Sequence, residues 1–150
     1  MSACVLLLAG CGGSGKVEIS SPDVTAAERT ACERFLAALP AELAGQKSRT
    51  VTPAGALGAA WGDPAFTVTC GVAVPQGFDR LAGCTQVNGV GWFVPEDQIS
   101  DQGKDVVMTT IDRKPNIEVD VPSEYRPPDA TMVDLAPSIK QHTEVVSPCE

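Results

Sequence analysis

Cysteines are the residues of this 150-residue chain whose chemistry is most constrained by their spacing. No Cys-x-x-Cys pair occurs and His142 is the sole histidine, so the spacings typical of zinc sites and of thioredoxin-like redox motifs are missing. Cys4 and Cys11 lie in an apolar N-terminal segment. The others form an even set, as disulfides require: Cys32, Cys70, Cys84 and Cys149. Disulfides indicate an oxidising compartment outside the cytoplasm.

Carboxylates on neighbouring predicted strands are the second group of interest. Asp112, with Arg113, precedes a predicted turn, and Glu118 and Asp120 follow it. A carboxylate pair at this spacing could perform general acid–base catalysis. Charged side chains on opposed strands more often form a ladder on a solvated face, which is the arrangement we expect here.

An acidic loop and the single histidine are weaker candidates. Asp97, Asp101 and Asp105 are four residues apart, whereas a calcium loop of the EF-hand type needs acidic ligands two residues apart. His142 has no serine, cysteine or acidic partner at a recognisable motif spacing, so we expect it on the surface. The sequence therefore predicts no catalytic residue, no metal ligand and no cofactor.

Trp61, Asp63 and Trp92 are the candidate binding residues. The two indoles could stack on a sugar or an aromatic ligand, but tryptophans in a chain with 5% aromatic residues more often fill the core. Asp63 lies in Trp61-Gly62-Asp63-Pro64, a turn sequence in which the carboxylate bonds to local backbone.

Cys11 ends an export signal. Residues 3–9 are uncharged and far shorter than the ~20 residues that span a bilayer, as in the apolar part of a signal peptide. Leu8-Ala9-Gly10-Cys11 resembles the lipobox of bacterial lipoproteins, in which the cysteine thiol is acylated. No Lys or Arg precedes the apolar run, so we expect the reading frame to begin upstream and residues 1–10 to be a signal-peptide remnant.

The glycine- and serine-rich composition after Cys11 indicates a flexible tether. We expect residues 11–24 to comprise the lipidated cysteine and this tether, and residues 25–150 to form a single globular domain. The expected location is the outer face of the cell membrane.

The net charge of −8 limits the partners. No basic stripe is present that could neutralise phosphates, which excludes nucleic acid. The acidic body would also be repelled by anionic lipids, so contact with the membrane depends on the lipid at Cys11. Basic partners or cations suit such a domain.

The predicted elements give an α+β fold, a small and mainly antiparallel sheet with an N-terminal and a C-terminal helix packed on it. Thr25 and Glu28 form a capping box that begins a helix over residues 25–40. Strand alternation over residues 65–72, an Asn88-Gly89 hairpin, and a second hairpin between residues 105–113 and 117–121 supply the sheet. A final helix is predicted to begin near Asp134, with Pro137 in its first turn.

The same periodicities rank the disulfide pairings. Cys32 shares the apolar face of the first helix, and Cys70 shares the apolar face of the strand over residues 65–72, so both point inward. Cys84 and Cys149 lie in peripheral segments. We therefore predict Cys32–Cys70 and Cys84–Cys149 pairs, while the other two connectivities remain open.

These landmarks together resemble an uncharacterised family, the domain of unknown function 3515 of actinobacterial secreted lipoproteins. The resemblance covers about residues 30–140 and rests on five segments: Cys32 to Pro40, "WGDPAFTVTCGVAVP" at 61–75, "VNGVGWF" at 87–93, "TTIDR" at 109–113 and "YRPPDATMVDLAPSI" at 125–139. It implies an exported, membrane-anchored envelope protein and assigns no catalytic residue.

Two function classes follow. The first is a non-catalytic binding or assembly module held at the membrane through Cys11, with an envelope protein as the candidate partner. The second is a small envelope hydrolase or metal-dependent enzyme that uses acidic residues. The absence of a nucleophile motif and the single histidine favour the binding module.

Overall fold

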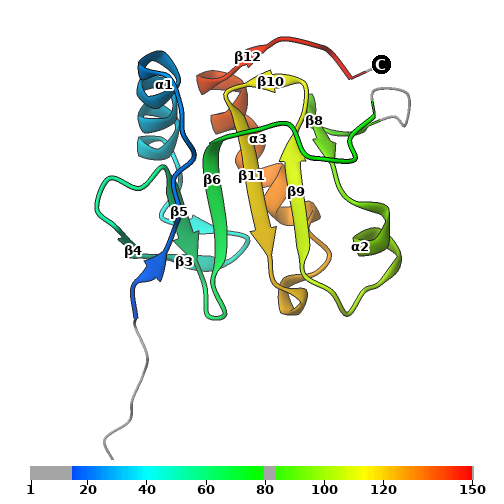
Figure 1. The fold of residues 1–150 in the computed structure, drawn as a ribbon. Helices are drawn as coiled ribbons and strands as arrows, with labels where there is room; N and C mark the ends of the chain where they lie inside the picture. Colours follow the sequence, from blue (N-terminus) through cyan, green and yellow to red (C-terminus); the bar gives the residue numbers. More distant parts are fainter. Residues whose placement is uncertain (1–14, 80–83, 150) are drawn as a thin grey trace, which may run out of the picture.

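The computed structural model describes residues 15–79 and 84–149 and has the predicted α+β architecture (Figure 1). Its main sheet has the strand order β2-β3-β5-β6-β11-β9-β8-β7, and every neighbouring pair is antiparallel. The strands are β2 (Glu42–Leu43), β3 (Gln46–Arg49), β5 (Gly58–Trp61), β6 (Phe66–Val72), β7 (Thr85–Val87), β8 (Val90–Phe93), β9 (Val106–Thr110) and β11 (Asn116–Val121). Helices α1 (Ala26–Ala37) and α3 (Asp129–His142) lie behind this sheet in Figure 1.

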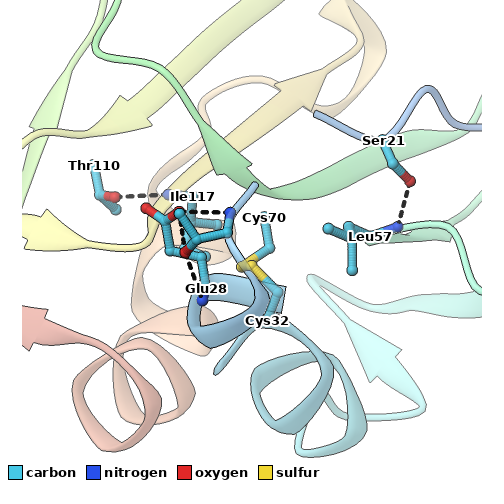
Figure 2. Close-up of a disulfide and its surroundings, with 8 residues drawn as sticks. Ser21, Glu28, Cys32, Leu57, Cys70, Thr110 and Ile117 are labelled. Carbon is cyan, nitrogen blue, oxygen red and sulfur yellow. Dashed lines mark hydrogen bonds between the residues drawn. A yellow bond between two sulfur atoms is a disulfide. The ribbon is translucent and has the colours of Figure 1, made fainter. Parts of the chain in front are cut away.

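Helix α1 begins where the capping box predicts. The Thr25 hydroxyl accepts a hydrogen bond from the Glu28 N–H at 3.3 Å, and the Glu28 carboxylate accepts one from the Thr25 N–H at 3.0 Å. Both are drawn in Figure 2. Phe35 and Cys32 from this helix are buried against the sheet.

The Cys32–Cys70 disulfide joins α1 to the central strand β6, as predicted (Figure 2). The two Cα atoms are 5.6 Å apart, within the usual range for a disulfide. Strand alternation places Phe66 and Val68 on the same buried face as Cys70, while Ile117 pairs directly with Cys70 from β11. The core therefore lies between this face and the two long helices.

The predicted hairpins are confirmed. Val87 pairs with Val90 across Asn88 and Gly89, whose φ angles of 49° and 78° are those that a tight hairpin turn requires. Strands β9 and β11 pair antiparallel in the second hairpin. Their connection is longer than a simple turn, because it includes the short strand β10 (Arg113–Lys114).

The start of the final helix was predicted wrongly. Helix α3 begins at Asp129, directly after Pro128, and Pro137 lies in its interior rather than in its first turn. Asp134 does not cap the helix, because its carboxylate accepts a hydrogen bond from the Ala44 N–H at 2.9 Å. The apolar residues 130–135 are thus part of the helix and supply its buried face, including Met132 and Leu135.

The predicted flexible tether is corrected for residues 17–24. Strand β1 (Val17–Glu18) pairs in parallel with β4 (Val51–Thr52), and the Ile19 side chain is 5% exposed. The Ser21 hydroxyl accepts a hydrogen bond from the Leu57 N–H at 2.8 Å (Figure 2). The β1–β4 pairing, the buried Ile19 side chain and the Ser21 hydroxyl thus attach residues 17–24 to the folded domain.

The C-terminal tail crosses back over the sheet edge after α3. Strand β12 (Glu144–Val145) pairs antiparallel with β10, and the Val146 N–H donates to the Asp112 carbonyl at 2.8 Å. The Cys84–Cys149 disulfide then fastens the tail next to β7, which confirms the second predicted pairing. Within the described ranges, no helix is both long and apolar enough to cross a bilayer.

Candidate functional site

The face of the sheet opposite the long helices carries an unusual row of carboxylates and hydroxyls. In β11, Glu118 and Asp120 alternate with the buried Val119 and therefore point away from the core. Thr69 and Thr109 flank Glu118 on the neighbouring strands. Thr67 and Val107 flank Asp120 in the same way. We call Thr67, Thr69, Val107, Thr109, Glu118 and Asp120 the acidic face.

The acidic face holds its negative charge at a cost. Burial, and secondly the charge of Asp120, raise the pKa of the Glu118 carboxyl above its ordinary value. Partial desolvation by the surrounding sheet, and secondly the charge of Asp105, raise the pKa of Asp120. Among the residues that the structure describes, no lysine or arginine forms an ion pair with Glu118 or Asp120.

Backbone hydrogen bonding fixes the third carboxylate near this face. Asp105 precedes β9, and its side chain accepts a hydrogen bond from the Ser123 N–H at 2.9 Å. Ser123 begins the short 3-10 helix η1 (Ser123–Tyr125), which directly follows β11. The turns at this end of the β9–β11 pair therefore hold the Asp105 carboxylate where its charge acts on Asp120.

The spacing of the two carboxylates limits which groups could bind both of them. Glu118 and Asp120 are two residues apart on one strand, a spacing of about 6.5 Å that separate lysine or arginine groups can match. In the described ranges, no group of three or more His, Cys, Asp or Glu residues is placed to hold a metal ion. A basic partner would supply the missing counter-charges and donate hydrogen bonds to the carboxylates.

The predicted ladder of Asp112 and Arg113 with Glu118 and Asp120 is wrong. Thr109 is the β9 residue that stands opposite Glu118, and β9 ends one residue later at Thr110. Asp112 and Arg113 lie beyond it, buried under the C-terminal tail. Glu118, which is partly buried, and the exposed Asp120 therefore lack, among the described residues, the basic partner that the ladder would have provided.

Trp61 and Trp92 fill the core and cannot stack on a ligand, since 1% and 0% of their surfaces are exposed. The Trp61 indole N–H donates to the Pro40 carbonyl at 3.1 Å, and its ring stacks on Phe66 with centroids 5.8 Å apart. Tyr125 packs edge-on against the other side of this cluster, 5.6 Å from Phe66. The binding role considered for both tryptophans is therefore corrected.

Asp63 is exposed and acts within its turn. The Tyr125 hydroxyl accepts a hydrogen bond from the Asp63 N–H at 3.1 Å, and the Asp63 carboxylate lies 3.6 Å from Arg49. Gly62 has a φ of 77°, and a Cβ atom there would lie 2.8 Å from the Tyr125 hydroxyl. The Trp61-Gly62-Asp63-Pro64 segment thus connects β5 to β6 and contacts η1, and its residues have structural tasks.

The acidic loop forms no calcium site of the kind considered. Asp97 lies in the short helix α2 (Glu96–Ser100) and pairs with Lys104 at 3.1 Å. Asp101 accepts a hydrogen bond from the Gly103 N–H at 3.0 Å, which closes a local turn. Asp105 points toward β11 instead, so the three carboxylates do not converge.

His142 lines a groove of about 400 Å³ between α1 and the end of α3. Glu28 and Lys114 pair at 3.4 Å at this groove. Hydrogen bonds from Thr25, and to a smaller extent Lys114, lower the pKa of the Glu28 carboxyl. Glu28 and Lys114 are therefore paired with each other, and Arg34 and Glu144 line the same groove.

The sequence alternation that forms the acidic face was visible, but we predicted that Asp112 and Arg113 would lie opposite these carboxylates. Glu118 and Asp120 share one face by simple alternation, but their lack of a cationic partner depends on where β9 ends. Cys11, the predicted lipidation residue, lies outside the described residues.

Comparison with known proteins gives one result. The model of the DUF3515 family, described as a protein of unknown function, matches residues 3–147. Searches of the curated proteins and of the solved structures found no significant match.

Proposed function

The chain belongs to the DUF3515 family, whose description names no activity, and we propose that it is a lipid-anchored binding module whose acidic face holds a cationic segment of an envelope protein. One observation carries this proposal. Glu118 and Asp120 stand side by side on a central strand, partly desolvated, with no positive partner among the described residues. Such carboxylates destabilise the free protein, and a basic partner removes that cost.

The anchoring part of the proposal rests on the sequence around Cys11 and on the disulfides. The lipobox-like Leu8-Ala9-Gly10-Cys11 supports acylation, and two disulfides support an oxidising compartment. Five residues separate Cys11 from Val17, the first residue of β1, so the two Cα atoms can be at most about 22 Å apart in any conformation. The domain would therefore work next to the membrane surface.

Binding at the acidic face is tested by titrating the oxidised full-length chain, uniformly labelled with ¹⁵N, with hexalysine. The expected chemical-shift changes concentrate on β6, β9 and β11, and the Glu118→Gln/Asp120→Asn variant loses most of them. Both substitutions preserve side-chain size and remove charge from one face.

A charge-matched control separates this site from general attraction to an acidic protein. Glu33→Gln/Asp129→Asn removes the same charge from exposed positions on α1 and α3, behind the sheet. This control should bind hexalysine as the parent protein does. Equal loss of binding in both variants, or shift changes spread over the whole acidic surface, would contradict the proposal.

A further inference from the structure

The two described disulfides differ in their access to solvent. Cys32 and Cys70 are 0% exposed and lie in the core between α1 and β6. Cys84 and Cys149 are partly exposed and lie outside helices and strands. A thiol reagent in solution can therefore approach the second pair without any opening of the core.

The second disulfide fastens the tail after α3, close to the short strand β12. Strand β12 is two residues long, and the Val146 and Ser147 N–H groups both donate to the Asp112 carbonyl, at 2.8 and 3.4 Å. Cys149 then packs on Gly91, where a Cβ atom would lie 3.0 Å from the Cys149 Sγ. The valines of this tail, Val145 and Val146, are exposed and contribute little burial.

A charge pair lies beneath this tail. The Asp112 and Arg113 side chains are 4% and 6% exposed, and Asp112 Oδ1 lies 3.8 Å from Arg113 Nε. Neither of these two atoms has a hydrogen-bond partner. Burial of an ion pair with incomplete hydrogen bonding is unfavourable, so water that reached the pair would favour the open tail.

We propose that Cys84–Cys149 is a site of thiol–disulfide exchange with an external dithiol, and that its reduction releases the C-terminal tail and uncovers Asp112 and Arg113. In the reaction, one thiolate of the dithiol attacks a sulfur of the protein disulfide and forms a mixed disulfide. The second thiolate then displaces the protein sulfur. The protein gains two electrons and two protons as the Cys84 and Cys149 thiols, and the dithiol becomes a disulfide.

The interactions that stabilise the rest of the fold are not broken by this reaction. The Cys32–Cys70 disulfide, the β6–β11 pairing and the buried faces of α1 and α3 do not involve residues 144–149. The oxidised tail and the released tail are thus two states of one folded domain, and the redox state of a surface disulfide selects between them.

The test reduces the oxidised full-length chain with increasing concentrations of dithiothreitol under native conditions, alkylates free thiols with iodoacetamide and maps the labelled peptides. Cys84 and Cys149 should be labelled at concentrations about tenfold lower than those needed for Cys32 and Cys70. At the intermediate concentration, hydrogen exchange should show loss of protection at the Val146 and Ser147 amides and continued protection in β6.

Two variants check the consequence without a reductant. Cys84→Ser/Cys149→Ser should unfold cooperatively and show the same unprotected tail amides, whereas Cys32→Ser/Cys70→Ser should lose protection in β6. If the first variant fails to fold, selective reduction of the parent protein still shows whether loss of the Cys84–Cys149 disulfide releases the tail. Simultaneous reduction of both disulfides, or a tail that stays protected after selective reduction, would overturn the proposal.

Discussion

At the residue scale, the ionised Glu118 carboxylate lowers the stability of the free protein. Its ionised form is disfavoured by burial and by Asp120, which is why the pKa of its carboxyl is raised. Functional sites commonly carry such unfavourable charge, and removal of that charge stabilises the protein while binding is lost. The stability of a single variant can therefore report on the site without knowledge of the partner.

Glu118→Gln should raise the free energy of unfolding at pH 7 by about 0.5 kcal/mol. The folded-state pKa of Glu118 lies above its ordinary value of 4.5. As the pH falls, the Glu118 carboxyl therefore takes up its proton in the folded parent protein before it does so in the unfolded chain, and the parent protein gains stability. The difference in free energy of unfolding between the variant and the parent protein should decrease as the pH falls past the raised pKa, and should disappear below pH 4.5. Denaturant titrations across this range measure it; a variant less stable at pH 7, or a difference independent of pH, would contradict the account.

The buried Asp112–Arg113 pair should respond very differently from the Asp63–Arg49 pair, in which the carboxylate is exposed. Asp112→Asn leaves the Arg113 guanidinium buried without a counter-charge and is expected to cost about 3 kcal/mol. Asp63→Asn makes the same chemical change at a side chain that is 77% exposed, and is expected to cost less than about 1 kcal/mol. Denaturant unfolding of both variants at pH 7 compares them, and equal losses would show that the tail does not seal Asp112 from water.

At the element scale, the first strand decides where the domain begins. Ile19→Ala removes a nearly buried side chain that packs on Gly58 and should lower the free energy of unfolding by about 2 kcal/mol. Glu18→Ala, at an exposed neighbouring position, should change it by less than about 0.5 kcal/mol. Thermal unfolding of both variants measures the difference. If Ile19→Ala left the stability unchanged, residues 17–24 would behave as a tether rather than as part of the folded domain.

Elements whose signals are local could be predicted from the sequence, and elements set by distant contacts could not. The capping box at Thr25 and the turn at Asn88-Gly89 each depend on a few adjacent residues. Strand β1 is two residues long, too short for a clear alternation signal, and forms because β4 offers it backbone partners more than thirty residues later. The place where β9 ends, which leaves Glu118 and Asp120 unpaired, likewise depends on pairing with β11 and β8.

At the scale of the whole molecule, anchoring and binding are separate properties with separate tests. Acyl chains on Cys11 would contribute ~0.8 kcal/mol per buried CH₂, which an acidic body needs to stay on an anionic membrane. Cys11→Ser should therefore move the protein from the membrane fraction to the medium, or leave it as an uncleaved precursor. Cell fractionation and the mass of the N-terminal peptide measure this. A variant that is normally processed and remains membrane-bound would contradict the anchor.

The most direct test of the acidic face uses the anchored protein in its own envelope. A photo-crosslinking amino acid placed at Thr69, next to Glu118, should capture a defined protein, and the same residue at Glu33 on α1 should not. The crosslink at position 69 should disappear in the Glu118→Gln/Asp120→Asn background and persist in the Glu33→Gln/Asp129→Asn background, with the captured segment rich in lysine or arginine. Capture that is insensitive to Glu118 and Asp120, or stronger from position 33 in the otherwise unchanged protein, would show that the working surface lies elsewhere.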